Sequence, residues 1–168
     1  GILVLIEDIS EGKRLQGAMR RFMPQQVVDQ VLERDDDLMF GSACQASILF
    51  ADIRGFTALS EQLTPRQTVD MLNEVFTDLF EAVSANKGIV DKYIGDAVMA
   101  VFGVPFASAE DPANAVRGAM AMLAALDVVN ARPDRGTLPL RLGVGIATGE
   151  VVAGTIGSPK RMDYTVIG

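Results

Sequence analysis

Histidine is absent from this 168-residue chain, and cysteine occurs only once, at Cys44. Without histidine there is no Ser-His-Asp triad, no histidine acting as acid or base, and no histidine-ligated metal. A single cysteine forms neither an intrachain disulfide nor a thiolate zinc site, and it is typical of a reducing compartment. We therefore expect a cytoplasmic location and a chemistry that relies on other side chains.

Basic residues are in the minority, because 15 lysines and arginines oppose 22 acidic residues and the net charge is −7. This balance argues against a broad nucleic-acid-binding face, but it leaves room for a local pocket that holds one nucleotide. The longest run without a formal charge, residues 38–51, is too short to span a bilayer. With 49% hydrophobic residues in one domain's length, we expect a single well-filled core.

The chain divides into three parts. Residues 1–10 are typical of a strand that leads into a polar turn, and residues 11–45 of a helical linker. Residues 46–168 carry the stronger signals of a folded domain. Because the chain opens at Gly1 with no basic start, we identify no signal peptide and expect a fragment of a longer protein.

Hydrophobic periodicity within the folded part alternates between strands and helices. We predict strands over residues 47–51, 89–93, 97–102, 141–148 and 151–156, with a further strand from residue 163. One helix is predicted to begin at Thr64 with a capping box, carry an apolar stripe over residues 69–83 and end at Gly88. A second is predicted over residues 111–132. This order predicts an α+β fold, a ferredoxin-like βαββαβ core with a mainly antiparallel sheet.

Two aspartates follow apolar neighbours at predicted strand ends. Asp52 ends the first strand, and Asp96 lies in the turn of a predicted hairpin. If the hairpin lies beside the first strand, both carboxylates reach one edge of the sheet and form an all-oxygen site that suits Mg²⁺ or Mn²⁺. On spacing alone, a strand-end aspartate is more often a cap or turn former. The glycines from Gly143 to Gly157 contain no Walker-type phosphate loop, and we expect them to permit bends and close strand packing.

Three separated blocks are present in order: FADIRGFT at residues 50–57, DKYIGD at residues 91–96 and GVGIATGE at residues 143–150. Together they resemble the class III nucleotidyl cyclase catalytic domain over residues 46–168. The resemblance implies two metal ions, Mg²⁺ or Mn²⁺, in each active site. It implies that Asp52 and Asp96 are catalytic metal ligands, with the Ile53 carbonyl as a further ligand.

The resemblance also assigns the substrate contacts. It places the backbone of Gly55, Phe56 and Thr57 around the triphosphate, and it gives the choice of base to Lys92 and Thr165. A lysine donates to adenine N1 and a threonine hydroxyl accepts from the N6 amino group, whereas guanine presents the opposite pattern. The Lys/Thr pair is similar to the adenylate cyclase branch of the family, so we expect ATP as the substrate. Without the blocks, Lys92 would be taken as a surface lysine and Thr165 as a strand former.

In this family, active sites form between two catalytic domains, so a chain that carries both half-sites is expected to be a symmetric homodimer. The family continues beyond the position of Gly168 with a catalytic Asn and Arg, and we therefore expect the 168-residue fragment to turn over poorly. Glu150 stands where some relatives carry a phosphate-binding Arg. Residues 1–10 are similar to the end of a PAS sensor domain, which implies a sensor in the same parent chain. An equally good interpretation is that these residues are a remnant without a function.

The sequence leaves three functions to be compared. An adenylate cyclase that makes cyclic AMP and pyrophosphate in intracellular signalling is favoured by the intact Asp52 and Asp96. The alternative is a catalytically silent, cyclase-like module that dimerises and binds nucleotide. A guanylate cyclase is disfavoured by Lys92 and Thr165.

Overall fold

The computed structural model describes residues 41–132, 139–158 and 161–168. The predicted PAS-like strand and the linker up to residue 40 lie outside the described residues. The elements in chain order are β1 (Ser42–Ile53), α3 (Phe56–Ser60), α4 (Pro65–Ala85), β2 (Ile89–Ile94), β3 (Ala97–Phe102), α5 (Asp111–Asn130), β4 (Leu142–Ser158) and β5 (Arg161–Ile167). None of the helices in these ranges is long and apolar enough to cross a bilayer.

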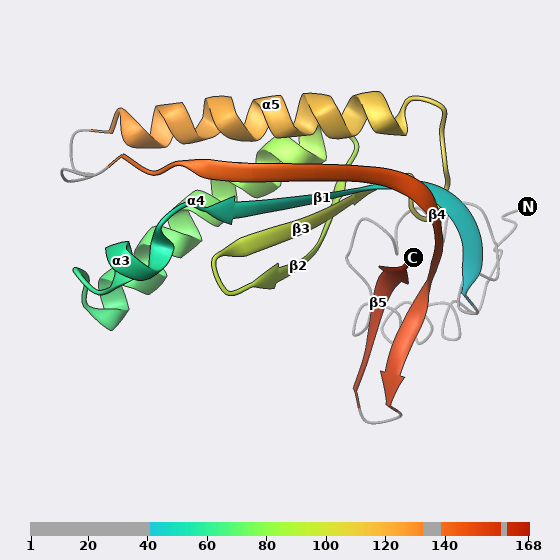
Figure 1. The fold of residues 1–168 in the computed structure, drawn as a ribbon, viewed down its shortest axis with the longest axis horizontal. Helices are drawn as coiled ribbons and strands as arrows, with labels where there is room; N and C mark the ends of the chain where they lie inside the picture. Colours follow the sequence, from blue (N-terminus) through green and yellow to red (C-terminus); the bar gives the residue numbers. More distant parts are fainter. Residues whose placement is uncertain (1–40, 133–138, 159–160) are drawn as a thin grey trace, which may run out of the picture.

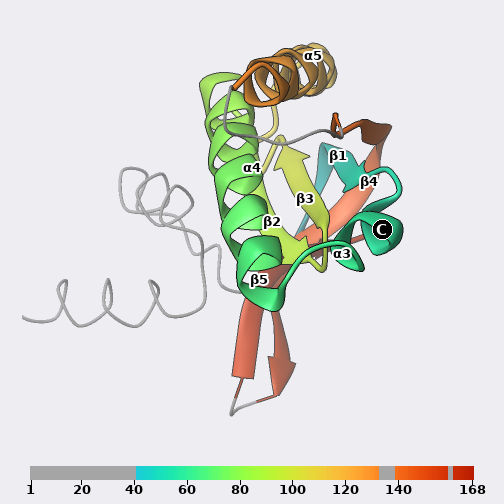
Figure 2. The same cartoon turned by 90° about the vertical axis from the view of Figure 1, so that its left-hand side faces the viewer.

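The five strands form one sheet in the order β2-β3-β1-β4-β5, and every neighbouring pair is antiparallel. Helices α4 and α5 pack together on one face of this sheet, as Figures 1 and 2 show from two directions. The predicted α+β fold with an antiparallel, ferredoxin-like core is therefore confirmed. The opposite face carries no helix among the described residues, and we call it the helix-free face.

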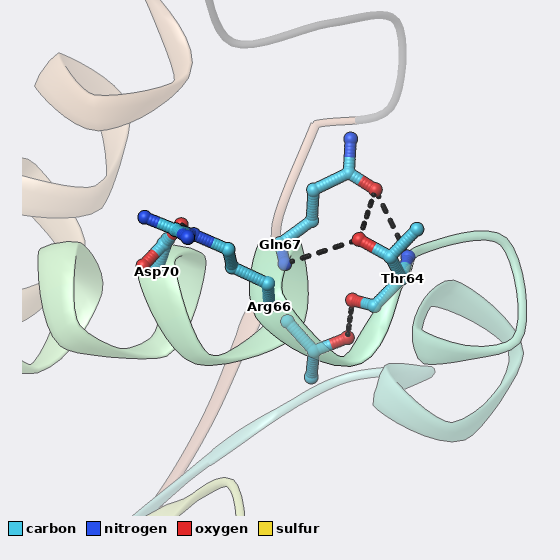
Figure 3. A network of polar contacts seen from close by, with 5 residues as sticks. Thr64, Arg66, Gln67 and Asp70 are labelled. Atoms are coloured by element: carbon cyan, nitrogen blue, oxygen red, sulfur yellow. Dashed lines mark hydrogen bonds and ion pairs between the residues drawn. The ribbon is translucent and has the colours of Figure 1, made fainter.

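Helix α4 begins as the sequence predicts. The Thr64 hydroxyl accepts a hydrogen bond from the Gln67 backbone N–H, and the Gln67 carboxamide accepts one from the Thr64 N–H (Figure 3). Pro65 occupies the first turn, where its missing N–H leaves no helical bond unmade. The predicted apolar stripe is buried at Leu79 and Val83, but its first residue, Val69, is 54% exposed.

Between the helices and the sheet lies the main hydrophobic core. Alternate residues of β1 (Leu49, Ala51 and Ile53) point into it, as strand geometry requires. The buried members of this core are Leu49, Ala51, Ile53, Val75, Leu79, Ala82, Val83, Val90, Val98, Ala100, Phe102, Ala115, Ala119, Met122, Leu126, Val129 and Leu140. The intervening residues of β1 face the helix-free side.

Strand β4 corrects one prediction. Instead of two strands separated at Gly149, residues Leu142–Ser158 form a single strand that bends strongly and carries β5 away from the helices (Figure 1). Gly149 adopts ordinary extended backbone rather than a turn, and a Cβ there would meet open space. Beneath the bend, a second cluster of apolar side chains, Val151, Ala153, Tyr164 and Val166 among them, buries residues of β1 to β3 on the helix-free face.

Two further differences lie at either end of β1. The strand begins at Ser42, inside the segment predicted as linker, because the length of β4 gives Ser42 to Gln45 pairing partners from Glu150 to Ala153. After the strand, the short helix α3 was not predicted, since its five residues contain too little of a helical period to show one.

Candidate active site

The register of the sheet brings Asp52 and Asp96 to the same edge. Asp52 pairs with Ala97, the residue that follows Asp96. Asp96 lies with Gly95 in a two-residue turn between β2 and β3, and the φ of +64° at Gly95 is a conformation that glycine adopts without strain. Because paired strands lie about 4.8 Å apart, the two aspartates are close neighbours at this strand end.

Neither aspartate is engaged within the part of the chain that the structure describes. The carboxylates of Asp52 and Asp96 make no hydrogen bond or ion pair there, and Asp52 is exposed. Two neighbouring carboxylates without internal partners are a donor set that fits a hard divalent cation. No third acidic or thiol side chain joins them among the described residues, so the remaining ligands would be backbone oxygens, water and phosphate. The residues present therefore fit Mg²⁺ or Mn²⁺.

Lys92 lies on the same face of the sheet as Asp52. Directly opposed residues on paired strands point to the same face, and the register forms one row through Phe50, Met99 and Lys92 and a second through Asp52, Ala97 and Ile94. Both rows belong to the helix-free face, because Met99 packs in the second apolar cluster. Asp52 and the candidate base contact Lys92 thus share one surface.

Lys92 and Thr165 meet although 73 residues separate them in sequence. The Lys92 Nζ donates to the Thr165 Oγ1 at 3.2 Å. The contact exists because β5 folds back over β2 where β4 bends. The structure therefore brings together the two residues predicted to contact the base, while their roles stay a prediction.

Sequence reasoning overlooked a third member of this group, Asp91. Its Oδ2 accepts a hydrogen bond from the Thr165 Oγ1 at 2.7 Å and lies 3.4 Å from the Lys92 Nζ. The Asp91 side chain is only 6% exposed. We call Asp91, Lys92 and Thr165 the base-contact cluster. Asp91 is the first residue of the DKYIGD block, but its contact with Thr165 could not be predicted because the two residues are distant in the chain.

Tyr164, the neighbour of Thr165 in β5, is buried, and its pKa reflects this. Burial raises the pKa of the Tyr164 phenol to about 12, with a smaller contribution from the nearby Cys44 thiol. The pKa of Cys44 is itself raised by burial. Tyr164 is thus a neutral, apolar wall of the strand that carries Thr165.

The segment predicted to surround the triphosphate forms the start of α3. Gly55 has a φ of +72° and precedes the helix, a conformation that few other residues adopt readily. Phe56 packs against the main core, and Thr57 is exposed. The first N–H groups of a helix have no acceptor within it, so the backbone here has donors available to an anion.

Two arginines beside this segment escaped the sequence analysis. Arg54 and Arg141 line an open pocket of about 400 Å³ together with Gly55, and neither guanidinium is paired with a carboxylate among the described residues. The Arg54 side chain lies across Gly143, where any Cβ would overlap its guanidinium. Gly143 pairs with Asp52, so Arg54 lies on the Asp52 side of the sheet.

Comparison with known proteins identifies the family. Residues 40–168 match the family model described as the adenylate and guanylate cyclase catalytic domain. The chain belongs to this family, and the resemblance inferred from its three sequence blocks is confirmed.

Individual proteins that are similar to the chain are also cyclases. An adenylate cyclase from Anabaena cylindrica is 35% identical over 167 residues, which cover 93% of this chain and 32% of that protein. Among solved structures, the guanylyl cyclase Cya2 is 40% identical with a TM-score of 0.73, covering 77% of this chain and 66% of that one. The adenylyl cyclase CyaB from P. aeruginosa is 35% identical with a TM-score of 0.74, covering 77% and 68%.

These relatives include both adenylyl and guanylyl cyclases, so family membership defines a cyclase domain and leaves the base open. The chain spans 28% to 32% of the length of the first curated relatives it matches.

Proposed function

We propose that this chain is the catalytic domain of an adenylate cyclase, which converts ATP to 3′,5′-cyclic AMP and pyrophosphate. The observation that carries the proposal is the contact between Lys92 and Thr165 on the face that also bears Asp52. A lysine ammonium donates to adenine N1, and a threonine oxygen accepts from the N6 amino group. Guanine carries a hydrogen on N1, which opposes the lysine donor.

Asp52 and Asp96, with the Ile53 carbonyl, would hold two Mg²⁺ or Mn²⁺ ions. Bound divalent cations supply the charge that lowers the pKa of the ribose 3′-hydroxyl and stabilises the pyrophosphate leaving group. The backbone at Gly55, Phe56 and Thr57 orients the triphosphate. Because the reaction is intramolecular, holding the 3′-oxygen in line with the α-phosphorus provides much of the acceleration.

Arg54 is a further candidate for the polyphosphate. Its guanidinium lies over Gly143 beside the strand end that carries Asp52, without a carboxylate partner among the described residues. A guanidinium binds phosphate oxygens through paired N–H donors. We assign to Arg54 part of the phosphate neutralisation that the acidic Glu150 cannot provide.

Two copies of the chain would form the active enzyme as a homodimer. Large apolar side chains remain exposed on the helix-free face in the same rows as the candidate site residues: Phe50 is 46% and Ile94 is 50% exposed. A second copy placed over this face would cover them and bring the metal-binding edge of one chain toward the base-contact cluster of the other. Sedimentation of the protein should give twice the chain mass, and a monomer at all concentrations would contradict this arrangement.

The remaining assignments follow from the proposed reaction. We place the enzyme in the cytoplasm, in intracellular signal transduction, where ATP is available. Residues 1–10 would be the end of a PAS-like sensor domain in the same chain, the linker would end before β1 begins at Ser42, and the catalytic domain would follow.

A guanylate cyclase is the second candidate, because the solved structure of the guanylyl cyclase Cya2 is 40% identical to this chain. The same structural features also allow a silent module that binds nucleotide without turnover. The three functions differ in product, so one assay separates them.

The deciding experiment measures cyclic AMP and cyclic GMP made by the full-length protein from ATP and GTP, with Mg²⁺, with Mn²⁺ and with a chelator. We expect metal-dependent formation of cyclic AMP and a kcat/KM for ATP well above that for GTP. A preference for GTP would favour the guanylate cyclase, and metal-independent nucleotide binding without product would favour the silent module.

A further inference from the structure

Strand β2 contains a bulge at the base-contact cluster. Val90 pairs with Ala100 and Lys92 pairs with Met99, so that Asp91 has no partner on β3. In a regular strand, neighbouring side chains point to opposite faces. The bulge breaks this alternation, and the side chains of both neighbouring residues, Asp91 and Lys92, contact the Thr165 hydroxyl.

The hydrogen bonds within the cluster define the direction in which the Thr165 hydroxyl points. A carboxylate only accepts hydrogen bonds, so the Thr165 hydroxyl must use its single hydrogen in the bond to Asp91. The Lys92 ammonium only donates, so it occupies one lone pair of the same oxygen. One lone pair remains, and toward an incoming base the hydroxyl can only accept.

We propose that Asp91 is a positioning residue for base selectivity, which acts through the Thr165 hydroxyl and makes it an obligatory acceptor. A base with an exocyclic amino group at position 6 satisfies this acceptor, whereas a carbonyl oxygen there meets a second acceptor. The inference rests on the proposed function, because it requires that Lys92 and Thr165 contact the base. It adds a residue that never touches the substrate.

A purely structural role, in which Asp91 anchors β5 against β2, explains the contacts less well. Apolar packing already joins the two strands, because Ile89 of β2 lies in one buried cluster with Tyr164 and Val166 of β5. An almost fully buried carboxylate next to such side chains is costly unless it is hydrogen-bonded, and Asp91 accepts its hydrogen bond from the hydroxyl that we propose contacts the base.

The test compares wild-type full-length protein with Asp91→Asn on three substrates: ATP, GTP and purine riboside triphosphate, which lacks the 6-amino group. An amide presents either its oxygen or its NH₂ to Thr165, so the hydroxyl is free to reverse. We expect the ratio of kcat/KM for ATP to that for GTP to fall by at least about tenfold. The preference for ATP over purine riboside triphosphate should fall as well. Asp127→Asn, at an exposed position on α5, is the control and should leave both ratios unchanged.

A double-mutant cycle separates positioning from general damage. In a Thr165→Val background there is no hydroxyl to orient, so Asp91→Asn should no longer alter the ATP to GTP ratio. An equal further change in that background would overturn the inference. If Asp91→Asn does not fold, Asp91→Leu removes the acceptor with an apolar side chain of similar size and should give the same loss of selectivity.

The two proposals fail in distinguishable ways. A wild-type protein that prefers GTP, or shows no base preference, overturns the proposed function together with the role of Asp91. A wild-type protein that prefers ATP, with a folded Asp91→Asn variant of unchanged ratios, overturns the role of Asp91 alone.

Discussion

The two parts of the candidate site differ in whether other residues of the protein make polar contacts with their side chains. At the metal-binding edge, Asp52 and Asp96 make no polar contact with any described residue. In the base-contact cluster, two hydrogen bonds and one ion pair join Asp91, Lys92 and Thr165. The edge therefore requires an external cation to balance its charge, whereas the cluster is organised before a substrate arrives. Substitutions at the edge should affect the rate and hardly the fold, and substitutions in the cluster should affect selectivity and stability together.

The largest effect is expected at the metal-binding edge. Asp52→Asn or Asp96→Asn should lower metal-dependent kcat by on the order of 10³-fold, because each removes a charged ligand from the reacting centre. The free energy of unfolding without metal should change by no more than about 0.5 kcal/mol, since neither carboxylate has an internal partner. Cyclase assays and chemical denaturation measure the two effects, and Asp70→Asn on the exposed surface of α4 is the control. A large loss of stability would show that the edge is held by interactions of its own.

The next effect is expected in the base-contact cluster. Lys92→Glu should lower the ATP to GTP ratio of kcat/KM by at least about tenfold, because the donor to adenine N1 becomes an acceptor. It also places a second carboxylate beside the buried Asp91, so the thermal midpoint should fall. Lys87→Glu makes the same charge change at an exposed position and should leave the ratio unchanged. An unchanged ratio would contradict the assignment of Lys92 to the base.

A smaller effect is expected at Arg54, which lies over Gly143 beside the strand end that carries Asp52. Arg54→Gln should raise the KM for ATP by about three- to tenfold and change kcat less, because one phosphate contact is lost while the base contacts remain. Arg66→Gln, at an exposed position on α4, should leave KM unchanged. Initial-rate kinetics at saturating Mn²⁺ measure both variants. Equal KM values would show that the Arg54 pocket lies outside the path of the phosphates.

The smallest effect concerns the burial around the cluster. The pKa of Tyr164 is raised to about 12, so the folded chain keeps a proton that the unfolded chain releases near pH 10. The stabilisation from this residue is complete below about pH 10 and is lost as the pH rises toward 12. Tyr164→Phe should therefore make the decline in unfolding free energy over this interval shallower. Denaturation at closely spaced alkaline pH values tests this, and identical slopes would show that Tyr164 is accessible to water.

Local signals were sufficient for much of the fold. The capping box at Thr64, the helix over α4 and the Gly95-Asp96 hairpin were correctly predicted, because each depends on residues within a few positions of one another. The break at Gly149 was wrong, since glycine favours a turn only when no neighbouring strand offers continuous pairing, and β1 pairs with β4 on both sides of that residue.

In the candidate site, too, local motifs could be predicted and contacts between distant residues could not. The motifs were enough to nominate Asp52, Asp96, Lys92 and Thr165, and the family they imply is confirmed. Arg54 was missed because its neighbour Gly143 is distant in sequence, and only their contact marks the position.

By itself, the sequence determined the two long helices, the β2–β3 hairpin, the family and the oxygen and nitrogen groups that are available for chemistry, because these depend on residue type and short-range order. The tertiary structure alone decided that β4 bends as one strand and that β5 returns over β2. It also decided that Asp91, beside a bulge, accepts a hydrogen bond from a hydroxyl 74 residues further along the chain. Such contacts depend on the register between distant strands, and register is a property of the whole sheet rather than of any one segment.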